Sequence, residues 1–420
     1  MDYKKFFSKI TNRRNYNLIR QLNDLYLSYP NGINFGSANP NGTKFPVEDI
    51  SLTYKHNNLI KLNKSELSTA FQLGSSQGHG PLLEKWKEFQ KTWHTPMYNN
   101  WDVAFTSGSL DACNKIFEMI LDENEPILLQ TLTYPGILGG LLPLLPDIIE
   151  INQDADGIIP EEITKACEQR LATGKPMPKL LYINPTGTNP TGAVLSETRR
   201  RKVYEVAQKY NFLIVEADPY YFVHFLDKQP TSFFSLDTDG RVIRLDSFKI
   251  MFPGIRVGIV TAHKDIVEKL IMHLDNSTVH TSALSQMLVY KLFQVWEPQQ
   301  FEEYFKDIQK FYRERRDIIL TLAEKHLTGL AEWYVPEGGF FLWVKLFAID
   351  NALDLVINKF VPQGVFAIPG NAFNCDPSKP SKHLRFCFSF SSPEEMDKGM
   401  ILVAKIIREE AAKKNDNVSK

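Results

Sequence analysis

Two carboxylates follow an apolar run near the middle of the chain, in the sequence EADPYY at residues 216–221. The apolar residues 212–215 predict a buried strand, and a carboxylate at the end of such a strand is costly unless it meets a cation. For Asp218, a protonated pyridine nitrogen would be such a cation, and the pairing would let the ring draw electrons from a substrate carbanion. The structural alternative is that Asp218-Pro219 forms a turn or a helix cap.

A lysine follows further along, in DSFK at residues 246–249, ahead of PGIR at residues 253–256. Beside Arg256 and near a positive cofactor, Lys249 would have a lowered pKa, so that its amine could form a Schiff base. Ser247 and Arg256 suit a phosphate, the arginine through a forked, charge-assisted contact. The alternative for an isolated lysine is a solvated surface side chain.

Three further segments carry polar groups beside predicted strands. In TSGS at 106–109, backbone N–H groups at a helix start and hydroxyls could bind an anion, although a plain serine N-cap explains the same residues. The turn NPTGTNPTG at 184–192 holds Asn189 rigidly, and turn formation accounts for its prolines and glycines but not for Asn189. Arg385 precedes an apolar run and could grip a small carboxylate, with a structural ion pair as the alternative.

The elements that must position these residues alternate between short β-rich runs and longer amphipathic stretches. The strand candidates are 103–105, 127–130, 148–151, 180–183, 212–216, 242–245 and 257–261. The helix candidates between them include 110–121, 161–172 and 197–210. This alternation predicts a mostly parallel sheet covered on both faces, with ligands bound at the carboxyl ends of its strands.

A second, smaller unit is predicted after the sheet. A long helical stretch at roughly 281–326 could bridge to it, and residues 330–412 read strand, strand, helix, strand, strand, helix. We therefore predict an α/β protein with a large, mostly parallel seven-stranded sheet domain plus a smaller α+β domain. The predicted ranges are 1–50 for an N-terminal arm or segment of the small domain, 51–310 for the large domain and 311–420 for the small domain.

Composition excludes several classes of function. The chain has 420 residues, 43% of them hydrophobic and 23% charged, and a formal net charge of −1, which gives no reason to expect nucleic acid or a membrane as partner. Its four cysteines form no CxxC pair, so we expect no metal site and a reducing compartment. The basic N-terminus lacks a secretory apolar run, which favours the cytoplasm, with a mitochondrial presequence as the alternative.

Taken together, these pieces resemble the fold-type-I aminotransferases that depend on pyridoxal 5′-phosphate (PLP), and among them the kynurenine/2-aminoadipate aminotransferase group. The likeness covers nearly the whole chain, from Arg20 to the C-terminal helix. Its most specific stretches are IVEADPYYF, DGRVIRLDSFKI, LTGLAEWYVPEGGFFLWVK, IPGNAFNCD and LRFCFSFSSPEEMD. The resemblance implies the PLP-dependent transferase fold.

The resemblance also implies roles for the residues around the ring of the cofactor. Lys249 would be the Schiff-base lysine that moves the substrate proton, and Asp218 would pair with the pyridine nitrogen. Tyr221 and Asn189 would hydrogen-bond the ring oxygen, and Tyr134 would stack on the ring.

Other residues would hold the phosphate and the substrate, again by resemblance. The phosphate ligands would be Ser109, the N–H of Leu110, Ser247 and Arg256. Arg385, with Asn189, would bind the α-carboxylate, and Arg20 would contact the far end of the substrate. Members of the family are homodimers with shared active sites, so a homodimer is implied.

The chain departs from the family pattern at three places around the cofactor. The family has Ser-x-Ser-Lys, whereas the present loop is one residue shorter, so that Asp246 stands three places before Lys249. A carboxylate facing a phosphate dianion would repel it, unless the loop presents Ser247 instead. Leu73 stands where the family carries a tyrosine that reaches the neighbouring subunit's phosphate, and Pro135 replaces a small residue after Tyr134.

The leading hypothesis is a transaminase that moves the amino group from an amino acid, such as 2-aminoadipate, kynurenine or an aromatic amino acid, to a 2-oxoacid such as 2-oxoglutarate. A second hypothesis is a PLP-dependent β-lyase or decarboxylase, because one fold hosts several reactions. A third is a catalytically impaired homologue that binds a ligand without turnover, which the shortened lysine loop and Leu73 motivate.

Overall fold

A seven-stranded sheet forms the centre of the molecule, in the order β3-β11-β10-β9-β8-β4-β5. The computed structural model describes residues 1–19, 22, 25, 29, 33, 39–55 and 58–418. The strands are β3 (Trp101–Thr106), β4 (Pro126–Gln130), β5 (Asp147–Ile151), β8 (Leu180–Ile183), β9 (Leu213–Ala217), β10 (Val242–Ser247) and β11 (Gly258–His263). β11 is antiparallel to β3 and β10, and the other neighbouring pairs are parallel. The predicted seven-stranded, mostly parallel sheet is confirmed.

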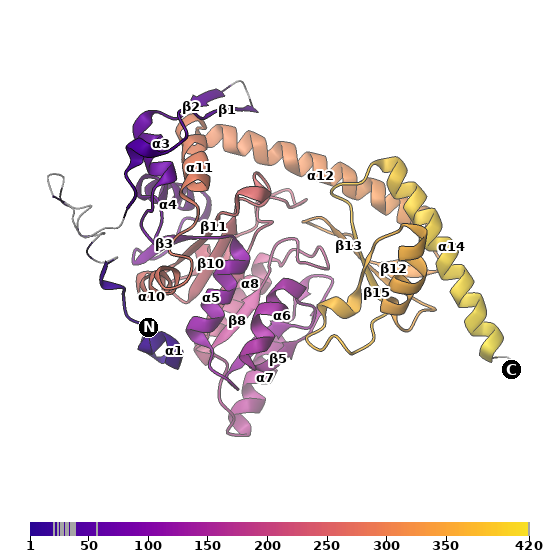
Figure 1. Cartoon of the computed structure of the whole chain (residues 1–420). Coiled ribbons are helices and arrows are strands. Elements are labelled where there is room, and N and C mark those ends of the chain that lie inside the picture. The colour runs from indigo at the N-terminus through magenta and orange to yellow at the C-terminus, as the bar shows by residue number, and fades with distance from the viewer. Residues whose placement is uncertain are drawn as a thin grey trace.

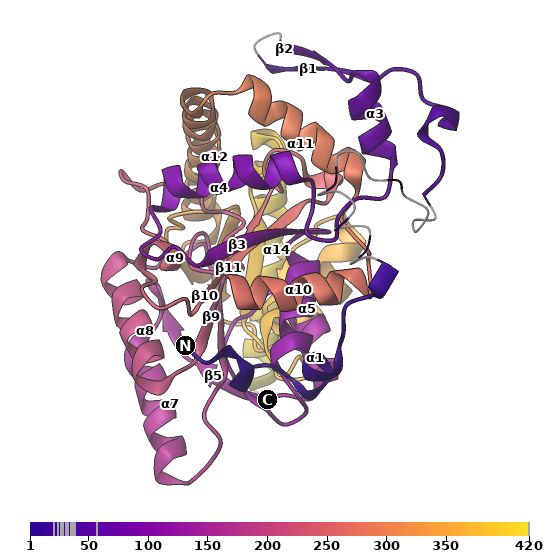
Figure 2. The ribbon, with the colours of Figure 1, turned by 90° about the vertical axis from the view of Figure 1, so that its left-hand side faces the viewer.

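Both faces of this sheet are buried, because successive residues of each strand point to opposite sides. In β9, Leu213 and Val215 pack on one face, while Ile214 packs on the other. The first face is covered by α5 (Ser109–Ile120), α6 (Pro135–Leu141) and α10 (Lys264–Asp275). The second is covered by α7 (Pro160–Ala172), α8 (Glu197–Tyr210) and α9 (Phe233–Leu236). Figure 2 shows α7 and α8 on one side of the strands and α5 and α10 on the other.

The helical stretch predicted near 281–326 is two helices, α11 (Ala283–Val295) and α12 (Pro298–Leu327). Pro298 starts α12 because its fixed φ suits a first helical turn, while its missing N–H and its ring disfavour a helix that continues through it. An aromatic-rich core joins α11 and the first part of α12 to α4 (Gly80–His94). The preceding segment forms a hairpin of β1 (Ser51–Tyr54) and β2 (Asn58–Lys61), followed by α3 (Lys64–Phe71).

A smaller antiparallel sheet, in the order β12-β13-β15-β14, forms a second unit. It contains β12 (Ala331–Trp333), β13 (Phe341–Leu346), β14 (Ile368–Pro369), β15 (His383–Cys387), α13 (Ala352–Leu355) and α14 (Pro393–Val418). In Figure 1, α12 runs from the large unit to this one. Ile308 of α12 belongs to the aromatic-rich core and Ile319 to the core of the small unit. The predicted domain boundary after residue 310 stays a prediction, and it falls inside a continuous helix.

The first residues of the chain pack on the large unit. Tyr3, Phe6 and Phe7 are buried in the core formed with α5 and α10, and Ser8 caps α1 (Lys9–Arg13). These apolar side chains pack against the hydrophobic surface beside α5, and the range 1–50 for an N-terminal arm or segment of the small domain stays a prediction.

The remaining elements are short. They are η1 (Tyr3–Lys5), η2 (Gly42–Lys44), η4 (Leu142–Leu144), β6 (Gln153–Asp154), β7 (Gly157–Ile158), η5 (Pro253–Ile255), η6 (Val356–Phe360), η7 (Val361–Gln363) and η8 (Gly370–Phe373). Among the described residues, no helix combines the length and the apolar character needed to cross a membrane.

Candidate active site

A cavity of about 720 Å³, open space at its mouth included, lies beyond the carboxyl ends of β8 and β9 and beside the start of α5. Its position is the one that open α/β sheets use to bind ligands. It is lined by Ser109, Leu110, Cys113, Tyr134, Ile137, Tyr182, Asn184, Asn189, Ala217, Pro219, Tyr220, Lys249 and Arg256. Six of the predicted site residues are therefore brought together: Ser109, Leu110, Tyr134, Asn189, Lys249 and Arg256.

Lys249 reaches this cavity from the loop after β10, despite the shortened loop. Its Nζ donates a hydrogen bond to the hydroxyl of Tyr220 at 2.6 Å and lies 4.6 Å from the centre of that ring. Desolvation lowers the pKa of the Lys249 amine, and the charges of Arg385 and Arg256 act in the same direction. A larger fraction of this amine is therefore neutral and nucleophilic than in a solvated lysine.

The start of α5 and Arg256 together form an anion site. Gly108, the N-cap, has a φ of 96°, and a Cβ there would collide with the guanidinium of Arg256. The side chain of Arg256 thus lies directly on the first turn of α5. The N–H groups of Ser109 and Leu110 belong to this turn, where an α-helix leaves its donors without intrahelical acceptors. These donors and the arginine suit a phosphate group.

Arg385 reaches the same region from the small sheet. Its Nη1 donates to Oδ1 of Asn189 at 2.7 Å, and its guanidinium lies 4.3 Å from the centre of the Phe341 ring. Nε of Arg385 is buried, and no hydrogen-bond partner for it occurs in the described part of the chain. A half-buried guanidinium that Asn189 holds in place, with a buried Nε that has no partner, is suited to receive a carboxylate from a ligand.

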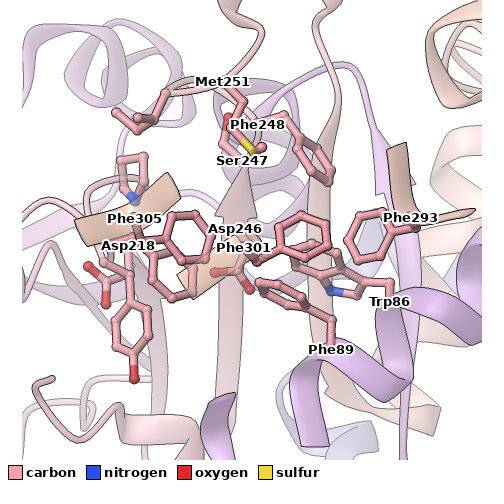
Figure 3. A pocket seen from close by; sticks show the side chains of 14 residues that line it. Trp86, Phe89, Asp218, Asp246, Ser247, Phe248, Met251, Phe293, Phe301 and Phe305 are labelled. Carbon is pink, nitrogen blue, oxygen red and sulfur yellow. The ribbon is translucent and has the colours of Figure 1, made fainter. Parts of the chain in front are cut away.

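Asp218 and Tyr221 are not among the residues that line this cavity, whereas their neighbours Ala217, Pro219 and Tyr220 are. Oδ1 of Asp218 is buried and has no hydrogen-bond partner in the described part of the chain, and the roles of Asp218 and Tyr221 at the cofactor stay predictions. Ala217, the last residue of β9, packs in the core on the α5 side, and Oδ2 of Asp218 lies 3.4 Å from Nη1 of Arg244, which also contacts Glu216. Figure 3 shows Asp218 together with Asp246 in a different pocket, among aromatic side chains of α4, α11 and α12.

Asp246 faces away from the anion site. Its carboxylate accepts from Nη2 of Arg244 at 2.7 Å and from Nε2 of Gln90 at 2.8 Å. The repulsion of a phosphate, which the sequence suggested, is therefore avoided. Ser247 is among the residues that line the aromatic pocket and not the cavity of Lys249, and its Oγ accepts a hydrogen bond from the backbone N–H of Lys249 at 3.2 Å. Its role as a phosphate ligand stays a prediction.

Sequence reasoning missed Tyr220, Ala217, Tyr182 and Cys113 as cavity residues. EADPYY offers two adjacent tyrosines, and nothing in the sequence chooses between them, because the choice depends on which sheet face carries α5. Tyr182 and Cys113 read as ordinary core positions of a strand and a helix. Arg20, the predicted contact for the far end of the substrate, lies outside the described residues.

Comparison with known proteins identifies the family. Residues 30–400 match the family described as Aminotransferase class I and II, and the chain belongs to it. It is 36% identical to the mitochondrial kynurenine/alpha-aminoadipate aminotransferase of Mus musculus and 35% identical to that of Bos taurus. Each match covers 97% of this chain and all of the relative.

Solved structures agree with this assignment. Aminotransferase Aro8 from Candida albicans has a TM-score of 0.88 at 25% identity, covering 98% of this chain and 99% of the other. The kynurenine aminotransferase of Pyrococcus horikoshii, solved with PMP, has a TM-score of 0.77 at 26% identity, covering 97% and 98%.

The chain is thus a PLP-dependent aminotransferase, and the cavity fits most of that cofactor. The anion site suits its phosphate and Lys249 suits its aldehyde. For the ring nitrogen of the cofactor, Asp218 stays the predicted partner. It stands between the cavity residues Ala217 and Pro219, and its Oδ1 is buried without a hydrogen-bond partner in the described part of the chain.

Proposed function

We propose that the chain transfers the amino group of an amino acid, from a broad range that includes 2-aminoadipate, kynurenine and aromatic amino acids, to a 2-oxoacid such as 2-oxoglutarate. The proposal rests on one observation. Lys249 and the anion site line the same cavity, and Arg385 donates a hydrogen bond to Asn189, which also lines it. The names of relatives support the substrate range, since they include kynurenine/alpha-aminoadipate and aromatic amino acid aminotransferases.

Each side chain has a role that follows from its place. When bound, PLP supplies a carbonyl carbon and an electron-withdrawing ring. The N–H groups of Ser109 and Leu110 and the guanidinium of Arg256 hold its phosphate, and Tyr134 covers the ring. The amine of Lys249 removes the proton at the substrate Cα and returns it during the reverse half-reaction.

Tyr220 and Arg385 orient the reacting groups. The hydroxyl of Tyr220 accepts a hydrogen bond from Lys249 and so fixes the position of its amine. The guanidinium of Arg385 binds the α-carboxylate of the substrate, which aligns one Cα bond for cleavage. Phe340 and Phe341 pack against Tyr220, with ring centroids 5.2 and 5.9 Å away, and add apolar surface that suits a long or aromatic substrate.

We also propose a homodimer with shared active sites, since the chain exposes apolar residues that a partner subunit would cover. Leu18, Leu22, Leu25 and Tyr29 each expose more than half of their surface. For the compartment, we propose the cytoplasm, because Tyr3, Phe6 and Phe7 belong to the folded core. The mitochondrion is the alternative, since relatives are named as mitochondrial.

A screen of amino donors against 2-oxoglutarate tests the activity, with Lys249→Ala beside the wild type. We expect wild-type formation of 2-oxoacid and glutamate, and a loss of at least about 10³-fold in Lys249→Ala, because general base and nucleophile are removed together. Lys264→Ala, at an exposed position on α10, is the matched control and should keep wild-type turnover. Turnover that survives in Lys249→Ala would refute the lysine assignment. Release of ammonia or carbon dioxide in place of glutamate would instead identify a lyase or a decarboxylase.

A further inference from the structure

Arg244, on β10, contacts two of the residues that are predicted to hold the ring of the cofactor. Its Nη1 lies 3.4 Å from Oδ2 of Asp218, and its guanidinium lies 4.6 Å from the centre of the Tyr221 ring. The side chains of Arg244 and Asp218 are fully buried, so water does not weaken their contact. Arg244 is not among the residues that line the cavity of Lys249, so its effect on a ligand there must pass through these neighbours.

The hydrogen bonds of the Asp218 carboxylate are all made by one of its oxygens. Oδ2 accepts from the hydroxyl of Thr186 at 3.2 Å and from Nη1 of Arg244 at 3.4 Å. Oδ1 is buried and has no partner in the part of the chain that the structure describes. A buried carboxylate oxygen without a partner is costly unless a ligand supplies a donor. Asp218 stands between the cavity residues Ala217 and Pro219, which makes a ligand of that cavity the expected source of the donor.

Arg244 also determines the charge around Asp218. Its Nη1 lies 3.1 Å from Oε2 of Glu216, and its Nη2 donates to Oδ1 of Asp246 at 2.7 Å. Arg200, whose Nη1 lies 3.7 Å from Oε1 of Glu216, is the second cation of this group. Three carboxylates and two guanidiniums leave one negative charge.

Two other titratable side chains near Arg244 add no charge. Burial lowers the pKa of His94, with the charge of Arg244 acting in the same direction, and burial raises the pKa of the Tyr221 hydroxyl. Both side chains are therefore neutral at neutral pH. The single positive charge of a protonated ring nitrogen would balance the one negative charge that remains.

We propose that Arg244 is a positioning residue for the PLP ring: it holds Oδ2 of Asp218, which leaves Oδ1 to accept from the ring nitrogen, and its charge stabilises the ionised carboxylate. This inference rests on the proposed function, since it requires bound PLP, and on the predicted pairing of Asp218 with the nitrogen. Without Arg244, the carboxylate loses the cation at its Oδ2, while a nitrogen at Oδ1 is farther from that cation. The proton that the two groups share then moves from the nitrogen towards Asp218.

The test is the protonation state of the cofactor, measured by NMR on the full chain loaded with PLP that is ¹⁵N-labelled at the ring nitrogen. We expect the wild type to show the chemical shift of a protonated ring at neutral pH. Arg244→Met keeps the bulk of the side chain but has neither charge nor donor, so the pKa of the nitrogen should fall by about 1–3 units. Arg244→Lys keeps the charge and should restore most of the wild-type shift.

Arg241→Met is the matched control for a purely structural role. Arg241 is also a buried arginine, and it forms an ion pair with Asp239 at 2.6 Å. Its loss should lower the midpoint of thermal unfolding and leave the signal of the nitrogen unchanged. If Arg244→Met fails to fold, the pair Arg244→Met and Asp246→Asn takes its place. This pair removes one charge of each sign, and Asp218 still loses the cation at its Oδ2.

The outcomes separate the inference from the proposed function. A nitrogen that keeps the wild-type signal without Arg244, or one that changes equally in Arg241→Met, overturns the inference while leaving PLP binding intact. An uncharged nitrogen in the wild type overturns it as well. Absence of any bound-PLP signal in the wild type contradicts the proposed function, and the inference with it.

Discussion

Five charged side chains are buried together beside β9 and β10, and their formal charges do not sum to zero. The carboxylates of Glu216, Asp218 and Asp246 meet the guanidiniums of Arg200 and Arg244, with Arg244 within 3.4 Å of all three carboxylates. Three negative groups against two positive ones leave one negative charge in excess. Burial raises the pKa of the Asp218 carboxyl to about 7. The charges of Glu216 and Asp246 also raise this pKa, whereas those of Arg244 and Arg200 lower it.

This raised pKa predicts how stability depends on pH. Between about pH 4 and pH 7 folded Asp218 keeps a proton that the unfolded chain has lost, so stability falls as pH rises through that window, by at most about 4 kcal/mol. The asparagine of Asp218→Asn cannot titrate. The midpoint of thermal unfolding of this variant minus that of the wild type should therefore increase from pH 5 to pH 8. Asp227→Asn, at an exposed position, is the control. A difference from wild type that does not change with pH would contradict this account.

At single positions, the sequence predicted the chemistry of the site better than its geometry. Lys249, Arg256 and Asn189 stand out by motif, and all three line the cavity. Asp218 was chosen because it is acidic and follows a strand, and its role stays a prediction. Which of its neighbours enters the cavity depends on the alternation of side chains along β9. Nothing local in EADPYY indicates which face carries α5, because that is fixed by contacts with residues 103–121.

At the scale of elements, the strand-to-helix turn from β3 to α5 shapes the anion site. The backbone turns at Gly108 with a φ of 96°, which strongly favours glycine, and this brings the first turn of α5 under Arg256. The sequence predicted both the strand and the helix here, with ends one or two residues from those observed. It also predicted an anion site at TSGS, but the contact between Gly108 and Arg256 joins segments far apart in the chain.

A substitution at this turn should lower the affinity for PLP without changing Lys249. In Gly108→Ala the new Cβ would collide with the guanidinium of Arg256, so the arginine must move off the first turn of α5. Loss of one charge-assisted contact costs about 1.5–3 kcal/mol, so the dissociation constant for PLP should rise at least about tenfold. Fluorescence titration with PLP measures it. Gly139→Ala, on α6 with open space around it, should bind as wild type does. Equal affinity in both variants would show that Arg256 does not hold the phosphate.

At the scale of the whole molecule, helix α12 and the active site both connect the large unit to the small one. The first part of α12 packs in the aromatic-rich core and its last part in the core of the small sheet, while Arg385 of that sheet contacts Asn189 of the large unit. The element order of both units was predictable from strand and helix periodicity. The pairing of Arg385 with Asn189 was not predictable from spacing, because 196 residues separate the two in the chain.

Exposed apolar residues near the start of the chain predict the oligomeric state. Four apolar residues that lie three or four positions apart in the sequence each expose more than half of their surface: Leu18, Leu22, Leu25 and Tyr29. We expect wild-type protein to sediment as a dimer at micromolar concentration, and the pair Leu22→Glu and Leu25→Glu to shift it to the monomer, because charge in an apolar interface is costly. Leu171→Glu, an exposed leucine on α7, should remain dimeric. If the active sites are shared, transaminase activity falls with dissociation and becomes dependent on protein concentration. A monomeric wild type, or a charged pair that leaves the dimer unchanged, would contradict this assignment of the interface.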